Sequence, residues 1–182
     1  MLFTLHLIAQ QLNKEKIIWA LGGSNVLKKY GIIDQVNDID ILVMQNDIEK
    51  ADQILSSLGN KISTPPSSLY LTSYFYQYEI RQIKVDLMCD FKIKYNNQVY
   101  TYIFDQSSIT DVDHIANIDI FYTSLEDWYV LYRLMKRNDE DKVKTLEKHF
   151  MLHGVKHREL ILRTLEQVPN DLKFKIKYQL GL

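Results

Sequence analysis

Two aspartates on one predicted strand are the side chains in this chain best suited to chemistry. Asp38 and Asp40 lie two residues apart in the segment 37–43, which is otherwise largely apolar. Successive side chains of a strand point to opposite faces, so both carboxylates share one face. Two carboxylates ~4 Å apart repel each other by about 4 kcal/mol at an effective dielectric constant near 20. A hard divalent cation such as Mg²⁺ would relieve that repulsion, because it prefers oxygen ligands.

A second predicted strand carries further carboxylates. Apolar side chains alternate along residues 83–91, which predicts a core face made of Ile83, Val85, Leu87, Cys89 and Phe91. The intervening residues then share the opposite face, and Asp86 and Asp90 are among them. Either one is a candidate third carboxylate beside the first pair.

A glycine turn precedes the first acidic strand. The apolar run 17–21 predicts a short buried strand, and Gly22 and Gly23 follow it directly. Two glycines allow a sharp turn and the close approach of a ligand to the backbone. Ser24 is expected to be the N-cap of a short helix ending near Gly31, and the free N–H groups of a helix N-terminus suit a phosphate. The alternative interpretation is a purely structural loop followed by an acidic turn.

The order of these motifs resembles a known signature. Gly23-Ser24, thirteen intervening residues and then Asp38-Ile39-Asp40 resemble the signature of the DNA polymerase β-like nucleotidyltransferase superfamily. That pattern places a third aspartate early in a later apolar strand, which favours Asp86 over Asp90. The resemblance, which spans about residues 15 to 91, implies catalytic carboxylates that hold Mg²⁺ or Mn²⁺. It also implies an NTP such as ATP bound at Gly22, Gly23 and Ser24.

The C-terminal part carries a looser resemblance. The segment from Ser124 to Asp127, followed by Lys136-Arg137 and an acidic run, is similar to the tail of small bacterial nucleotidyltransferases. These include antibiotic-modifying enzymes and toxins of the abortive-infection type. The resemblance implies that Lys136 or Arg137 reaches the triphosphate. The spacing of the acidic run at 139–141 departs from the toxin pattern.

The remaining elements follow from periodicity and turn residues. Helices are predicted over 2–14, 48–58, 125–135, 143–153, 156–167 and 172–180, and strands over 69–80, 83–91 and 118–123. Pro65-Pro66 predicts a loop, 92–104 a hairpin around Asn96-Asn97, and 105–117 an irregular polar segment. We therefore expect an α+β fold with a nucleotidyltransferase-type mixed sheet flanked by helices, followed by a C-terminal helical bundle. The predicted domains are a catalytic α/β domain at 1–123 and a helical region at 124–182 packed on it.

The amino-acid composition limits the kinds of partner and the compartment expected for this chain. A net charge of −1 over 182 residues argues against bulk electrostatic binding of nucleic acid, which is then expected only as an acceptor. The single cysteine, Cys89, excludes an intrachain disulfide and fits a reducing cytoplasm. We predict no signal peptide and no membrane span. The sequence gives no indication of oligomeric state.

The resulting hypothesis is a Mg²⁺-dependent enzyme that transfers an NMP from an NTP to a hydroxyl of an acceptor, with a small molecule such as an antibiotic favoured. One alternative is a toxin of a toxin–antitoxin pair that nucleotidylates tRNA or protein, and another is a nucleotide-binding pseudoenzyme. A zinc site at His149, His153 and His157 is a weaker hypothesis, because Gly154 is expected to end the helix between the last two.

Overall fold

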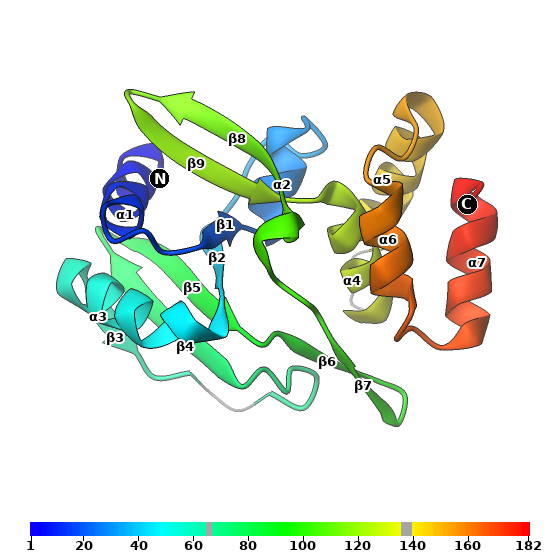
Figure 1. Cartoon of the computed structure of the whole chain (residues 1–182), viewed down its shortest axis with the longest axis horizontal. Helices are drawn as coiled ribbons and strands as arrows, with labels where there is room; N and C mark the ends of the chain where they lie inside the picture. The colour runs from blue at the N-terminus through cyan, green and yellow to red at the C-terminus, as the bar shows by residue number, and fades with distance from the viewer. Residues whose placement is uncertain (65–66, 136–139) are drawn as a thin grey trace.

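A mixed β-sheet forms the centre of the molecule, as seen in the computed structural model, which describes residues 1–64, 67–135 and 140–182 (Figure 1). The sheet has seven strands in the order β3-β4-β5-β2-β1-β9-β8. These are β1 (Trp19–Leu21), β2 (Asp38–Val43), β3 (Asn60–Ile62), β4 (Tyr74–Ile80), β5 (Ile83–Cys89), β8 (Ile109–Ile115) and β9 (Ile118–Thr123). A separate hairpin consists of β6 (Lys92–Tyr95) and β7 (Gln98–Thr101), turning at Asn96 and Asn97 as predicted.

The helices complete the predicted α+β class, which is confirmed. They are α1 (Leu2–Lys14), α2 (Gly23–Lys29), α3 (Ile48–Leu58), α4 (Leu125–Met135), α5 (Glu140–His153), α6 (Arg158–Leu165) and α7 (Asn170–Leu180). Two short 3₁₀ turns, η1 (Gln45–Asp47) and η2 (Gln106–Ser108), join strands to the segments that follow. None of the helices in the described ranges is both long and apolar enough to cross a lipid bilayer.

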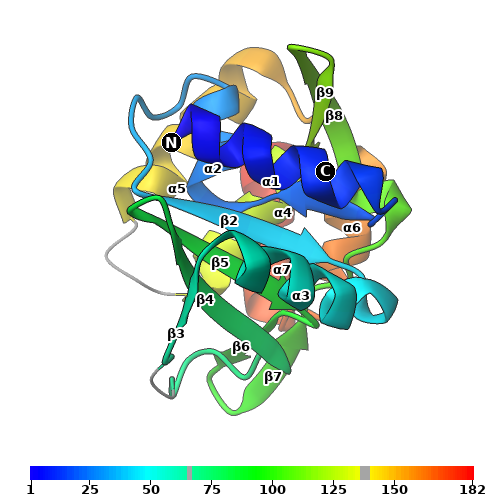
Figure 2. The ribbon, with the colours of Figure 1, turned by 90° about the vertical axis from the view of Figure 1, so that its left-hand side faces the viewer.

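Two apolar cores lie on opposite faces of the sheet. Helices α1 and α3 cover one face, where Figure 2 shows them in front of the strands, and α2 and α4 cover the other. Strand β2 contributes to both cores: Ile39 and Ile41 are buried under α1 and α3, whereas Leu42 is buried on the α4 side. This alternation leaves the start of β2 free to present Asp38 and Asp40 on the α2 and α4 side.

Polar contacts, both buried and partly exposed, hold the C-terminal helices against the rest of the chain. Asp127 of α4 is fully buried and accepts hydrogen bonds from Tyr102 Oη and Thr164 Oγ1. Arg163 of α6 forms an ion pair with Asp105 at 2.9 Å. These contacts link α4 and α6 to the segment between β7 and β8. The division into domains at residues 123 and 124 remains a prediction.

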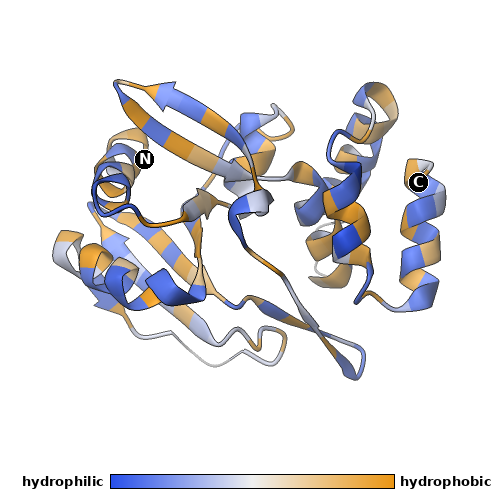
Figure 3. Ribbon diagram, in the orientation of Figure 1, coloured by the Kyte–Doolittle hydropathy of each residue, from blue (hydrophilic) through white to orange (hydrophobic). Residues whose placement is uncertain are grey.

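The structure differs from the predicted segments at residues 69–73, which precede β4 (Tyr74–Ile80) instead of belonging to it, and at residues 109–115. Residues 109–115 form β8, an edge strand paired with β9, although their polar composition predicted an irregular segment. Ala116 and Asn117 both have positive φ, which is the geometry of a tight hairpin turn. Lys29 of α2 lies against Asp111 and Asp113, and Figure 3 shows the hydrophilic and hydrophobic residues alternating along this hairpin. The predicted loop at Pro65-Pro66 falls outside the described residues.

Candidate active site

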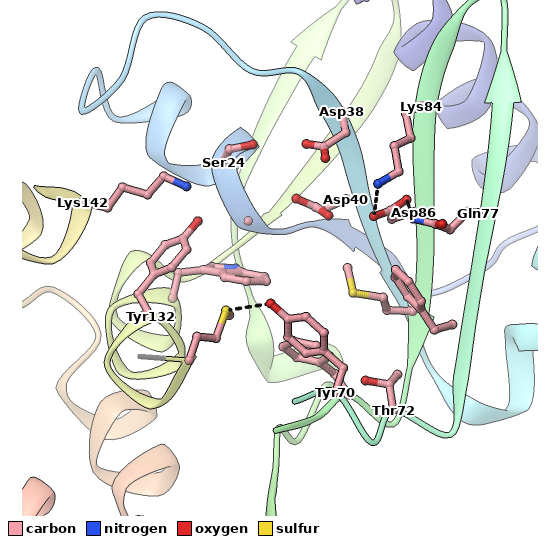
Figure 4. Close-up of a pocket in the computed structure, with 16 residues that line it drawn as sticks. Ser24, Asp38, Asp40, Tyr70, Thr72, Gln77, Lys84, Asp86, Tyr132 and Lys142 are labelled. Atoms are coloured by element: carbon pink, nitrogen blue, oxygen red, sulfur yellow. Dashed lines mark hydrogen bonds and ion pairs between the residues drawn. The ribbon is translucent and has the colours of Figure 1, made fainter. Parts of the chain in front are cut away.

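The three predicted carboxylates meet at one point of the sheet. Strands β2 and β5 are adjacent and parallel, and their register places Asp40 opposite Asp86 and Asp38 opposite Lys84. One carboxylate oxygen from each aspartate lies within 4.8 Å of the others, and Figure 4 shows the three side chains directed toward one another. Among the described residues, Asp38, Asp40 and Asp86 form the one group of three possible metal ligands that lie close enough together to hold an ion.

The electrostatics of this cluster fit a divalent cation. Asp86 is buried, while Asp38 and Asp40 are partly exposed. Although Asp40 is partly exposed, the surrounding protein keeps water away from its carboxylate. This desolvation, together with the negative charges of Asp38 and Asp86, raises the pKa of Asp40 to about 7. Burial also raises the pKa of Asp86, although the nearby ammonium of Lys84 works in the opposite direction. Clustered carboxylates in a partly dehydrated site are suitable oxygen ligands for Mg²⁺, so the chemistry of the donor set fits this ion.

Asp40→Asn is expected to stabilise the protein when no metal ion is present. The Asp40 carboxyl has a pKa of 3.8 in the unfolded chain, and folding raises this pKa to about 7. Ionisation therefore favours the unfolded chain, and the free energy of unfolding falls as the pH rises through this window. At one pKa unit per 1.4 kcal/mol, the free energy of unfolding of the variant should exceed that of the parent by about 1–3 kcal/mol at pH 8. The difference should be near zero at pH 4. Urea titrations in EDTA at both pH values measure it, and a constant difference would contradict the assignment.

The glycine turn is fixed against the acidic strand. Gly22 N donates a 2.9 Å hydrogen bond to the carbonyl of Asp40, and Asn25 Nδ2 donates a 3.1 Å hydrogen bond to the carbonyl of Asp38. The first residue of α2 is Gly23, at φ +56°, where an added Cβ would lie 2.0 Å from Asp40 Oδ2. Ser24 is therefore within the first turn and Gly22 is the N-cap, so the predicted N-cap is wrong by two residues.

The carboxylates and the turn open into one cavity of about 660 Å³. Its lining is Gly23, Ser24, Asp38, Asp40, Tyr70, Thr72, Phe75, Gln77, Lys84, Asp86, Met88, Phe91, Trp128, Tyr132, Met135 and Lys142. Of the predicted nucleotide-binding residues, Gly23 and Ser24 line this cavity. Gly22 lies behind them, where an added Cβ would be 2.3 Å from Trp128 Cζ2. Lys136 and Arg137 lie outside the described residues.

Three polar residues of the cavity were missed by sequence reasoning. Gln77 of β4 lies opposite Asp86 in the strand register, and its Nε2 donates a 3.0 Å hydrogen bond to Asp86 Oδ1. Lys84 Nζ lies 3.4 Å from the other oxygen of the same carboxylate. Lys142 of α5 extends toward Ser24 (Figure 4), and its Nζ lies 5.0 Å from the ring centroid of Tyr132. Alternation along 83–91 placed Lys84 on the face of Asp86, but the partners of the other two depend on tertiary contacts.

The histidine hypothesis is not supported by the geometry. The rings of His149 and His153 lie with their centroids 4.6 Å apart, tilted by 43° to each other, at the end of α5. Gly154, at φ +76°, then ends this helix, and His157 precedes α6. In the described parts of the chain, the three histidines do not form a group that could hold a metal ion.

Solved structures show the same fold. A protein of Thermotoga maritima assigned to the nucleotidyltransferases superimposes with a TM-score of 0.62 at 24% identity, covering 84% of this chain and 93% of its own. The antibiotic-resistance factor ANT(2″)-Ia superimposes with a TM-score of 0.58 at 14% identity, covering 97% of this chain and 91% of its own. The lincosamide antibiotic adenylyltransferase LnuA superimposes with a TM-score of 0.53 at 20% identity, covering 81% of this chain and 96% of its own. No protein-family model and no curated protein matches the sequence.

These likenesses define the class of fold. The chain has the mixed sheet and flanking helices of a nucleotidyltransferase fold, as implied by the resemblance that Gly23-Ser24 and Asp38-Ile39-Asp40 carry. The resemblance stated from the sequence is therefore confirmed for the fold.

Proposed function

We propose that this protein is a Mg²⁺-dependent nucleotidyltransferase that moves an NMP from an NTP, such as ATP, to a hydroxyl group of an acceptor. The observation that carries the proposal is the convergence of Asp38, Asp40 and Asp86 within 4.8 Å beside the Gly22-Gly23 turn. A chain with a nucleotidyltransferase fold needs few further parts, because such transfers depend mainly on positioning and electrostatic stabilisation.

Each site residue has a proposed role. Asp38, Asp40 and Asp86 would hold one or two Mg²⁺ or Mn²⁺ ions, which when bound supply positive charge beside the reacting phosphate. The backbone at Gly22, Gly23 and Ser24 lies against the phosphates. Lys142 adds positive charge at that end of the cavity, and Lys136 and Arg137 remain proposed contacts of the triphosphate.

The transfer step exchanges one phosphorus–oxygen bond for another. The acceptor oxygen forms a bond to the α-phosphorus while the bond from that phosphorus to the pyrophosphate oxygen breaks. The hydroxyl proton passes to the carboxylate of Asp86, which Gln77 and Lys84 hold in place through its two oxygens. Pyrophosphate leaves toward Ser24 and Lys142.

The proposed acceptor is a small hydroxylated molecule. The similarity to LnuA, a lincosamide antibiotic adenylyltransferase, favours an antibiotic-like acceptor over tRNA or protein. All three carboxylates are retained in one cluster, which argues against a pseudoenzyme. We propose a cytoplasmic location, with which the buried free thiol of Cys89 is consistent.

Calorimetric titration with ATP tests the metal and nucleotide site. The parent protein should bind ATP in Mg²⁺ at least tenfold more tightly than in EDTA, because the carboxylates repel the triphosphate unless a cation lies between them. The double variant Asp38→Ala/Asp40→Ala should lose this metal-dependent gain. Equal affinities in Mg²⁺ and in EDTA for the parent would contradict the proposal.

A further inference from the structure

We infer that the cavity binds the nucleobase of its donor nucleotide by stacking on an aromatic wall, which we define as Tyr70, Phe91, Trp128 and Tyr132. This inference rests on the proposed function and names the part of the cavity that takes the base. All four rings line the same cavity as the three carboxylates.

The four rings form a continuous surface. The ring centroids of Tyr70 and Phe91 are 5.8 Å apart, those of Phe91 and Trp128 6.3 Å, and those of Trp128 and Tyr132 5.9 Å. Phe91, Trp128 and Tyr132 are each less than 7% exposed and back the wall, whereas Tyr70 is partly exposed and is the ring that a ligand reaches. A planar ligand ring therefore meets a prearranged surface, which lowers the entropic cost of binding.

The wall has few polar groups left for a ligand. The indole N–H of Trp128 donates a 2.8 Å hydrogen bond to Thr123 Oγ1, and the hydroxyl of Tyr70 contacts the sulfur of Met135 at 3.4 Å. What Tyr70 and its neighbours offer is aromatic carbon and a thioether, while the ring of Tyr132 lies beneath the ammonium of Lys142. Such a surface suits a flat, uncharged ring, and it recognises the face of that ring rather than its hydrogen-bonding edge.

The reaction geometry directs the base toward this wall. Attacking and leaving oxygens lie roughly in line in phosphoryl-type transfer. Figure 4 places Ser24 and Lys142 at one end of the cavity and Lys84 and Gln77 at the other. The leaving pyrophosphate is assigned to the first end and the acceptor to the second. The α-phosphate has its non-bridging oxygens toward the carboxylates, so the nucleoside points away from them. Figure 4 shows Tyr70 on that opposite side, while Tyr132 lies nearer to Lys142.

Binding of ATP and of tripolyphosphate, both in Mg²⁺, tests the inference with the full chain. ATP should bind about tenfold more tightly than tripolyphosphate, because tripolyphosphate lacks the nucleoside whose base would stack. Tyr70→Leu should weaken ATP by about five- to tenfold and leave tripolyphosphate unchanged, whereas Tyr70→Phe should behave like the parent. GTP should bind within about threefold of ATP, because the wall recognises only ring faces.

Tyr76→Leu is the matched control, since Tyr76 is a β4 tyrosine that does not line the cavity and instead lies beneath the ammonium of Lys61. It should change neither affinity. Equal binding of ATP and tripolyphosphate, unaltered by Tyr70→Leu, would overturn the stacking inference and leave the proposed phosphate site standing. Failure of both ligands to bind in Mg²⁺ would refute the proposed function itself.

Discussion

Asp86→Asn is expected to lower the rate of Mg²⁺-dependent pyrophosphate release from ATP by about 10²–10⁴-fold, the usual range for the loss of a positioned acid or base. The amide keeps the size of the side chain but can neither accept the acceptor proton nor provide an anionic ligand. The buried position of Asp86, opposite Asp40 in the strand register, means that no solvent-exposed group replaces it readily. Single-turnover measurements at saturating ATP separate this loss from weaker nucleotide binding.

Asp90→Asn is the matched control for this prediction. Asp90 directly follows β5 at φ +53°, and its carboxylate accepts hydrogen bonds from Ser73 and Lys92 outside the cavity. Those hydrogen bonds lower the pKa of Asp90, so its carboxylate stays ionised and paired with Lys92, apart from the cluster around Asp40. Its replacement should leave the rate within about threefold of the parent. A larger loss for Asp90→Asn than for Asp86→Asn would reverse the assignment of the third carboxylate.

Gly23→Ala is expected to abolish detectable transfer, with a loss of more than about 100-fold, because catalysis is sensitive to displacements near 1 Å. The new Cβ would lie 2.0 Å from Asp40 Oδ2, so the Asp40 carboxylate must leave its place among the other two. The same substitution should remove the Mg²⁺-dependent gain in ATP affinity. Calorimetry and the rate of pyrophosphate release measure the two losses, and circular dichroism checks that the variant folds.

Gly31→Ala separates this clash from backbone strain. Gly31 also has a positive φ, +68°, but an added Cβ would meet nothing within 4 Å. Both alanine variants carry the cost of a left-handed backbone, ~1 kcal/mol, and only one displaces the Asp40 carboxylate. Gly31→Ala should therefore lose some stability and keep its ATP affinity. If both variants lost nucleotide binding equally, strain in α2 rather than the Asp40 clash would be the cause.

Local sequence patterns determined much of the candidate site. The two-residue period of strands placed Asp38 and Asp40 on one face and Asp86 on the corresponding face of β5, because this alternation depends only on neighbouring residues. The fold class was implied by the resemblance of the glycine pair and the acidic strand to a known family signature. The same local reasoning failed at β8, whose polar residues are stabilised by pairing with β9 and by Lys29, a residue about eighty positions away.

Only the tertiary structure decided which residues share the cavity. The order of the strands and their register bring Asp86 opposite Asp40 and Gln77 opposite Asp86, and neither can be derived from the alternation within one strand. Lys142 of α5 and Trp128 of α4 both line the cavity, and Trp128 packs against the glycine turn at Gly22. Side-chain periodicity is local, whereas register and helix packing minimise the free energy of the whole chain. The sequence therefore determined the reactive groups, and the fold determined their surroundings.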